Sequence, residues 1–162
     1  MFDITAAPAE ATQSSSGLLL VVEIICSNLR HLLYPRSKIA ALLLLVRLGR
    51  CCEDSIILQR VVPYVVLLLK DNNSSVRATA VRTLRALLSV VETFNSVETN
   101  LFSLYIFPSL KGIAKDSESV VRIAFAESIA SFAESAKRFL VTISFFLSLT
   151  TYYECDEHYD YY

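Results

Sequence analysis

A stretch in the middle of the chain recurs, in register, 45 residues further along. Six residues keep the same order and the same intervals in both copies. The matched pairs are Pro63 and Pro108, Lys70 and Lys115, Asp71 and Asp116, Ser74 and Ser119, Val76 and Val121, and Arg77 and Arg122. A period of about 40 to 50 residues is typical of solenoids, in which each unit buries its apolar face only by stacking on a neighbour. The repeat therefore predicts a stacked array, and such proteins usually bind rather than catalyse.

Apolar residues at helical spacing divide the chain into three predicted helical hairpins, over residues 17–49, 54–94 and 97–140. The second helices of the last two hairpins share one core stripe. Its members are Val76, Ala80, Leu84, Leu87 and Leu88 in the first copy, and Val121, Phe125, Ile129, Phe132 and Ala133 in the second. This agreement in phase predicts an all-α solenoid of about three hairpins, because stacked units must present equivalent faces.

Pro63 and Pro108 lie inside the first helix of their hairpins. A proline within a helix removes a backbone hydrogen bond and costs about 3 kcal/mol. Two prolines at equivalent places predict a deliberate bend in that helix, which lets it follow the curvature of the array.

The flanks have a different composition. Residues 1–16 are rich in Ala, Ser, Thr and Pro, and we expect a disordered linker there. Residues 141–162 form an atypical aromatic and acidic tail, expected to be poorly ordered after about residue 149 because the helical stripe ends.

A bent first helix with proline, a turn containing aspartate, and an arginine six residues later resemble HEAT repeats, of the armadillo-like superhelix class. The resemblance implies that Asp71, Arg77, Asp116 and Arg122 are ladder residues that hydrogen-bond from unit to unit. The first hairpin departs from the pattern, with Lys38 and Ile39 where valine and arginine would stand. We interpret it as a degenerate or capping repeat.

Residues 60–71, 76–84 and especially 120–140 resemble the regulatory, protein-kinase-like subunits of class III phosphatidylinositol 3-kinase. Members of that family carry a kinase-like domain, a HEAT solenoid and a WD40 propeller, and they scaffold the lipid kinase. The resemblance covers residues 17–140 and ends at Leu140. We therefore interpret the chain as a fragment of such a protein.

The resemblance implies protein partners, namely the class III phosphatidylinositol 3-kinase catalytic subunit and its regulators. It also implies a role in autophagy and in endosomal or vacuolar protein sorting. The expected localisation is cytoplasmic, peripheral to endosomal, vacuolar or autophagic membranes.

Catalytic motifs are missing from the sequence. Its three glycines, Gly17, Gly49 and Gly112, form no phosphate-binding loop, and neither Asp-Phe-Gly nor His-Arg-Asp occurs. His31 and His158 have no nucleophile at a motif spacing, and His31 fits a helix C-terminus. We predict that the chain is not an enzyme and has no catalytic residues and no cofactor.

The cysteines Cys26, Cys51 and Cys52 lie in apolar helical runs, where cysteine is a small hydrophobe. Cys155 and His158 flank two acidic residues, but nothing in the sequence gives that cluster a rigid frame. We predict no metal site.

Charge and hydropathy restrict the remaining ligand classes. A net charge of −1 provides no basic field for nucleic acid. No uninterrupted apolar run reaches the roughly 18 residues of a membrane span. The sequence therefore predicts no nucleic-acid partner and no transmembrane segment.

Several surface features leave alternatives open. Arg77, Arg82 and Arg85 share a face that suits either an acidic partner or solvent. Glu127 and Glu134 fit surface charges, with Glu134 at helical spacing from Lys137 and Arg138. Residues 139–153 suit a membrane interface, although the acidic residues that follow oppose binding to anionic lipid.

The sequence thus predicts a non-catalytic protein-interaction scaffold from the class III lipid-kinase regulatory family. The alternatives are a HEAT-repeat adaptor of another complex, and a helical protein peripherally bound to membranes through its tail.

Overall fold

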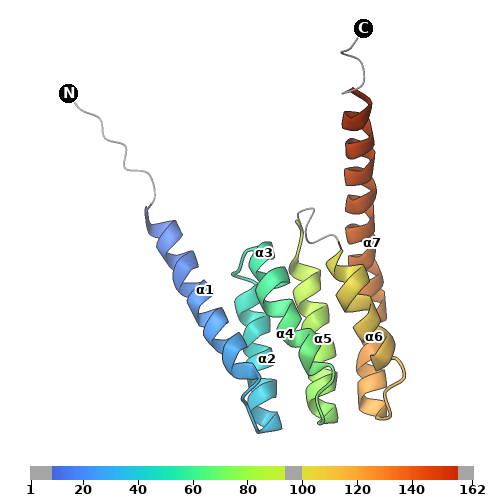
Figure 1. The fold of residues 1–162 in the computed structure, drawn as a ribbon. Coiled ribbons are helices and arrows are strands. Elements are labelled where there is room, and N and C mark those ends of the chain that lie inside the picture. The colour runs from blue at the N-terminus through green and yellow to red at the C-terminus, as the bar shows by residue number, and fades with distance from the viewer. Residues whose placement is uncertain (1–8, 94–99, 157–162) are drawn as a thin grey trace, which may run out of the picture.

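The computed structural model describes the backbone of residues 9–93 and 100–156, and the side chains of residues 17–93 and 100–139. All regular structure in these residues is helical. Six continuous helices follow one another as three antiparallel hairpins (Figure 1). They are α1 (Ala9–Leu29), α2 (Pro35–Gly49), the composite of α3 (Asp54–Ile56), η1 (Ile57–Val61) and α4 (Val62–Leu68), then α5 (Ser74–Val90), the composite of η2 (Phe102–Ile106) and α6 (Phe107–Ile113), and α7 (Ser119–Asp156).

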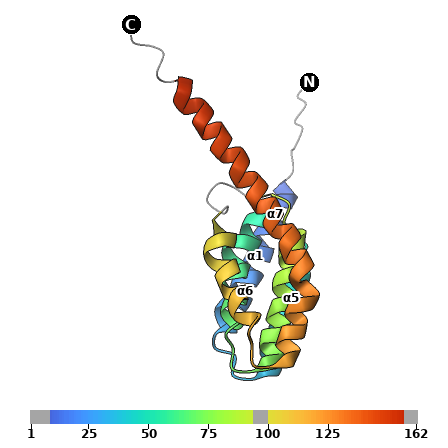
Figure 2. The ribbon, with the colours of Figure 1, turned by 90° about the vertical axis from the view of Figure 1, so that its right-hand side faces the viewer.

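The hairpins stack side by side in two layers. Helices α1, α4 and α6 form one layer, and α2, α5 and α7 form the other (Figures 1 and 2). The most extensive contacts join α5 to α7 and α2 to α5 within the second layer. This arrangement confirms the predicted all-α helical-repeat solenoid.

Two helices extend beyond their predicted limits. Helix α1 begins at Ala9, directly after Pro8 and inside the segment predicted to be disordered. Helix α7 continues to Asp156, although the third hairpin was predicted to end near residue 140. No glycine or proline follows Gly112 in the sequence, so the usual signals that end a helix do not occur there. Residues 1–8, 94–99 and 157–162 lie outside the described residues.

Each internal proline follows a π-helical turn. Pro63 and Pro108 stand at the second positions of α4 and α6, immediately after η1 and η2. The two π-helical segments are themselves 45 residues apart. Proline lacks an N–H group and its ring collides with the carbonyl four residues earlier, and a π-turn relieves both problems by widening the helix locally. The sequence analysis predicted a bend at these prolines, and the structure accommodates them in this way without ending the helix.

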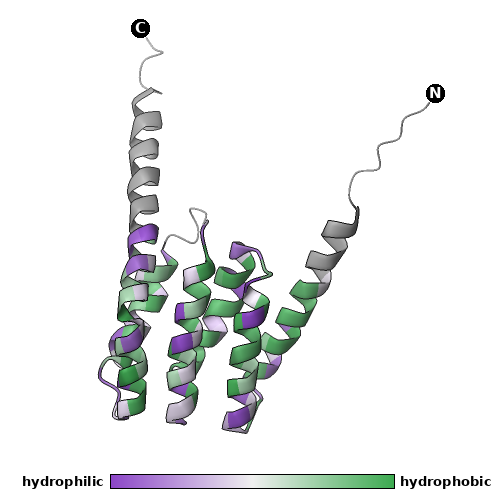
Figure 3. Ribbon diagram, turned by 180° about the vertical axis from the view of Figure 1, so that it is seen from behind, coloured by the Kyte–Doolittle hydropathy of each residue, from purple (hydrophilic) through white to green (hydrophobic). Residues whose placement is uncertain are grey.

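The predicted core stripe is buried in α5 but only partly buried in α7. Its five α5 members are at most 1% exposed. In α7, Val121 and Phe132 are buried, whereas Ile129 is 54% exposed and Ala133 is exposed. The cause is position, because α5 packs between α2 and α7, whereas α7 has a described neighbour within its layer on one side only. Exposed apolar residues also run along α1 at the opposite end, including Leu20 and Ile24 (Figure 3).

Two helical glycines provide a test of how closely the units approach. A Cβ atom on buried Gly49 of α2 would lie 2.6 Å from Leu87 Cδ2 of α5, whereas a Cβ on Gly112 of α6 would meet nothing within 4 Å. We expect Gly49→Ala to lower the free energy of unfolding by about 1 kcal/mol, because Leu87 is tightly enclosed. Gly112→Ala should raise it by about 0.5 to 1 kcal/mol, since alanine restricts the unfolded chain. Urea denaturation followed by circular dichroism measures both, and equal effects of the two substitutions would contradict close α2–α5 packing.

Candidate functional site

The turns that join the two helices of each hairpin lie along one edge of the array, at the bottom of Figure 1. The second helix of each hairpin follows Tyr34, Asn73 or Glu118. The residue four positions later is basic in all three cases, and its backbone N–H donates to the carbonyl of that preceding residue. These bonds are Lys38 to Tyr34 at 3.3 Å, Arg77 to Asn73 at 3.1 Å, and Arg122 to Glu118 at 3.3 Å. The three hairpins therefore share a single register at this edge.

Aspartate organises the second and third turns. Asp71 Oδ1 accepts a hydrogen bond from the Asn73 N–H at 2.9 Å, and Asp116 Oδ1 accepts one from the Glu118 N–H at 2.9 Å. The Asn73 side chain then caps α5 by accepting from the N–H groups of Ser75 and Val76. Each aspartate thus fixes its own turn and still presents a carboxylate oxygen to the preceding unit.

Arg77 joins the second hairpin to the third. Its Nη1 donates to the carbonyl oxygens of Asp71 at 2.9 Å and Asn72 at 3.2 Å, which fixes the guanidinium against its own turn. Its Nε and Nη2 donate to the two carboxylate oxygens of Asp116 at 2.7 and 2.8 Å. This contact is bidentate, and both side chains are nearly buried, at 13% and 10% exposed. The ladder contact implied by the resemblance is observed for this pair.

Lys38 makes the equivalent contact one unit earlier, as an ion pair with Asp71 in which both side chains are mostly buried. The sequence analysis placed Lys38 at the valine position of the repeat, and this register is wrong by one residue. Lys38 occupies the arginine position, so the first hairpin retains a cation there. If positions had been counted from the residue that precedes each second helix, Lys38 would have been assigned to the arginine position.

Arg122 of the third hairpin repeats the contacts that Arg77 makes with the carbonyl oxygens of its own turn. Its Nη1 donates to the carbonyl oxygens of Asp116 at 2.7 Å and Ser117 at 2.8 Å, as Arg77 does one unit earlier. Within the described residues no carboxylate contacts its Nε or Nη2, and the side chain is exposed. Among the residues that the structure describes, Arg122 thus makes the contacts to its own turn and not the carboxylate contact that Arg77 makes.

The contact between the units changes the acidity of both partners. The hydrogen bond from Arg77 holds the pKa of Asp116 below its ordinary value of 3.8, although burial acts in the opposite direction. The same hydrogen bond raises the pKa of Arg77. Both shifts favour the charged pair, which is the form that joins the units.

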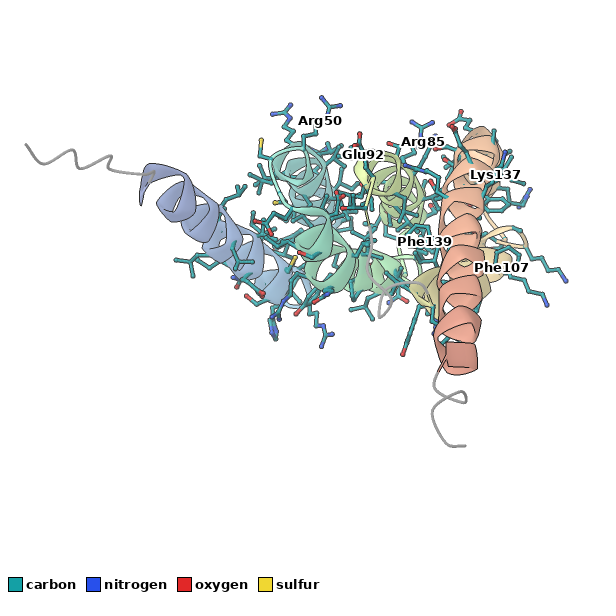
Figure 4. All side chains as sticks on the ribbon, turned by 90° about the horizontal axis from the view of Figure 1, so that it is seen from above. Arg50, Arg85, Glu92, Phe107, Lys137 and Phe139 are labelled. Atoms are coloured by element: carbon teal, nitrogen blue, oxygen red, sulfur yellow. The ribbon has the colours of Figure 1, made fainter. Side chains whose placement is uncertain are left out.

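The other arginines of the predicted polar face differ in their environments. Arg82 forms an exposed ion pair with Glu127 at 3.1 Å, which adds a second but solvated contact between α5 and α7. Arg85 points outward from the layer formed by α2, α5 and α7, as does Arg50 (Figure 4). Only Arg77 of the predicted set is enclosed between units.

Arg138 of α7 binds the end of α5. Its Nη1 donates to the Val91 carbonyl at 2.7 Å and its Nη2 to the Leu88 carbonyl at 2.9 Å. These carbonyls lie at a helix C-terminus, where they lack partners within the helix and favour a cation. The sequence analysis considered Arg138 only as a helical neighbour of Glu134, because sequence spacing does not reveal a contact between hairpins.

A groove of about 420 Å³ opens at the far end of the array, between η2–α6 and α7. Its lining is apolar except for one lysine. The lining residues are Phe102, Phe107, Leu110, Lys111, Phe125, Ile129, Phe132, Ala133 and Ala136.

The histidines and cysteines that the sequence analysis considered for catalysis or metal binding are dispersed. His31 lies just beyond α1, where its backbone N–H donates to the Asn28 carbonyl. Burial raises the pKa of the Cys26 thiol to about 11, so this thiol is protonated at neutral pH. No three His, Cys, Asp or Glu side chains that the structure describes are grouped to hold a metal, and Cys155 and His158 are outside that part. In the described residues no helix has both the length and the apolar character needed to cross a bilayer.

Residues 21–158 match the family model described as PIK3R4-like, middle domain. The chain belongs to this family. The match to the PIK3R4-like middle domain continues past Leu140, where the sequence analysis placed the end of the resemblance, and so includes most of the segment interpreted as an atypical tail.

Curated relatives of this PIK3R4-like middle domain are named as kinases. The chain is 38% identical over 134 residues to serine/threonine-protein kinase VPS15 of Arabidopsis thaliana, which covers 83% of the chain and 9% of that protein. It is 37% identical over 127 residues to the probable serine/threonine-protein kinase vps15 of Dictyostelium discoideum, covering 76% of the chain and 6% of the relative. The chain thus spans less than a tenth of the length of these relatives. The matches support the interpretation of the chain as a fragment of a protein of this kind.

The ladder contact should dominate the electrostatic coupling between units. We expect Arg77→Gln to lower the free energy of unfolding by about 2 kcal/mol, because it leaves the mostly buried Asp116 carboxylate without its bidentate donor. Arg82→Gln removes the exposed pair with Glu127 and should cost less than about 0.5 kcal/mol. Urea denaturation of the two variants tests this ranking, and similar losses would contradict it.

Asp116 should also give the protein a specific sensitivity to acid. Because its folded pKa lies below the ordinary value, its contribution is present at neutral pH and is lost as pH falls below about 4, through the folded pKa. Asp116→Asn should therefore be less stable than the wild type at pH 7, and the difference should shrink in acid. The raised pKa of Arg77 has no effect in this range, since arginine stays charged. A constant difference between pH 7 and pH 3 in urea denaturation would contradict the role of the carboxylate.

Proposed function

We propose that this chain is a non-catalytic scaffold segment of a class III phosphatidylinositol 3-kinase regulatory subunit. The observation that carries the proposal is the mostly buried Arg77–Asp116 contact, which fixes consecutive hairpins of a PIK3R4-like middle domain in one register. A stack fixed in this way presents side chains from several units at constant spacing, which suits recognition of a protein surface. The kinase activity in the relatives' names refers to proteins that are more than ten times longer than the matched segment.

The proposed partners are the class III phosphatidylinositol 3-kinase catalytic subunit and its regulators, in autophagy and in endosomal or vacuolar sorting. Family membership supports this assignment. The proposed location is cytoplasmic and peripheral to the membranes on which those complexes act. The outward faces of the two layers are the surfaces that would engage these proteins.

The test is capture of the purified lipid-kinase catalytic subunit by the immobilised full chain. We expect the wild type and Arg82→Gln to retain the subunit, and Arg77→Gln to retain less because the units lose their fixed register. Equal capture by Arg77→Gln and the wild type would show that register is unimportant, and failure of the wild type to capture would contradict the assignment. A parallel flotation assay with phosphatidylserine vesicles, without the subunit, distinguishes the membrane alternative, which predicts that the chain floats alone.

A further inference from the structure

Another groove lies between the second and third hairpins, near the turns of the array. It has a volume of about 600 Å³, which is within the range of ligand sites in proteins. The end of α4 and the turn after it form one wall, and α6 with the turn after it forms the other. Both hairpins contribute to this groove, so it is a property of the interface between two consecutive units.

The equivalent positions between the first and second hairpins carry large side chains. Tyr64 of α4 lies beneath Arg30, whose guanidinium carbon is 5.2 Å from the centre of the ring. Tyr64 is half-buried, and Leu67 follows it three residues later on the same helix. At that interface, an aromatic ring of one hairpin therefore meets a positive charge of the hairpin before it.

The third hairpin has small residues at the corresponding positions. Ser109 and Gly112 of α6 stand 45 positions after Tyr64 and Leu67, and both line the groove. A Cβ atom on Gly112 would meet nothing within 4 Å. The groove therefore has space for a large side chain where the preceding unit supplies a tyrosine and a leucine of its own.

The inner surface of the groove is apolar. Leu69, at the end of α4, and Ile113, at the end of α6, both line it and are buried. Pro108 adds an exposed ring from the start of α6. An aromatic side chain that enters the groove would cover this surface, and aromatic rings provide some of the largest apolar contacts in interfaces.

The charges around the groove leave one cation without a carboxylate. Asp71 and Asp116 line the groove, but their carboxylates are engaged by Lys38 and Arg77. Lys70 also lines it and is exposed, and no carboxylate of a described residue forms an ion pair with it. A ligand with a negative charge beside its apolar group would therefore complement the groove.

We propose that the groove between α4 and α6 binds a peptide in which an aromatic residue adjoins an aspartate or glutamate. The ring would occupy the space beside Ser109 and Gly112, and the carboxylate would pair with Lys70. The headgroups of an anionic membrane could also meet Lys70, but they could not place a ring between the two helices. This inference rests on the proposed scaffold function, to which it adds the chemistry of one ligand.

The test uses the full isotope-labelled chain and the probe peptide acetyl-Ala-Phe-Glu-Ala-amide. Nuclear magnetic resonance titration follows the amide signals of Asn72, Gly112 and Ser117, all of which line the groove. We expect saturable shifts of these three signals. Replacement of the phenylalanine by alanine in the peptide should weaken binding more than about tenfold, because it removes the ring that covers the apolar surface. Absence of saturable shifts with the original peptide would overturn the proposal.

Ser109→Tyr introduces the side chain that the second hairpin has at this position. We expect it to abolish peptide binding, because the new ring would fill the space that the ring of the ligand requires. Ser103→Tyr is the matched control, since Ser103 is exposed on the same composite helix and does not line the groove. Each serine hydroxyl donates to a backbone carbonyl three or four residues earlier, so the two changes remove similar contacts. Equal peptide binding by the two variants would contradict the proposed site.

A charge reversal keeps the test independent of packing, should Ser109→Tyr fail to fold. Lys70→Glu should weaken binding of the glutamate peptide about fivefold, and should strengthen binding of a peptide with lysine in place of the glutamate. Lys115→Glu is the matched control, because Lys115 is the equivalent exposed residue of the third hairpin and does not line the groove. Equal responses of the two variants would reveal an unspecific effect of charge and overturn the proposal.

Two further outcomes would identify a different occupant. If the same amide signals shift with the concentration of the chain alone, the occupant is a second copy and the proposal is wrong. If phosphatidylserine vesicles shift these signals and the peptide does not, the groove faces a membrane and the proposal is likewise wrong.

Capture of the lipid-kinase catalytic subunit is a separate measurement. Failure of peptide binding with intact capture would reject the ligand chemistry and leave the scaffold function standing. Failure of capture with intact peptide binding would reject the assigned partner and leave the ligand chemistry of the groove standing.

Discussion

The bidentate contact between Arg77 and Asp116 is the interaction on which the stacking of this protein depends. Apolar side chains alone would allow neighbouring helices to slide or rotate, because burial of apolar surface has no direction. A planar guanidinium held against a planar carboxylate, with both groups mostly buried, allows one arrangement. The same arginine also binds the carbonyls of its own turn, so the turn of one hairpin and the turn of the next are joined through a single side chain.

Two other contacts reinforce this register, one at each end of the helices. Lys38 and Asp71 join the first two hairpins near the same edge, and Arg138 joins α7 to the end of α5 at the opposite edge. Both connect backbone or carboxylate oxygens to a cation from the neighbouring unit. The array is therefore fixed at both ends of its helices, with the apolar stripe between them.

Much of this could be predicted from residue spacing. The 45-residue period and the shared stripe correctly predicted a helical solenoid, because stacking requires equivalent faces at a constant repeat. The contact between Arg77 and Asp116 was an implication of the resemblance to HEAT repeats. Lys38 was assigned one position too early because the first hairpin retains the cation of the motif but none of the other residues that define its register. Arg138 could not have been assigned, since its partners are backbone carbonyls of another hairpin and carry no residue signature.

The sequence by itself determined the repeat unit and the helical class, because residue spacing alone sets both. The tertiary structure alone decided which members of the repeated stripe are buried, because burial depends on what lies next to a helix and not on its own residues. Leu84 and Ile129 occupy the same place in the pattern, yet one is enclosed and the other is 54% exposed. Likewise Arg77 and Arg122 are equivalent in sequence, yet within the described residues only Arg77 has a carboxylate from the next hairpin against its Nε and Nη2.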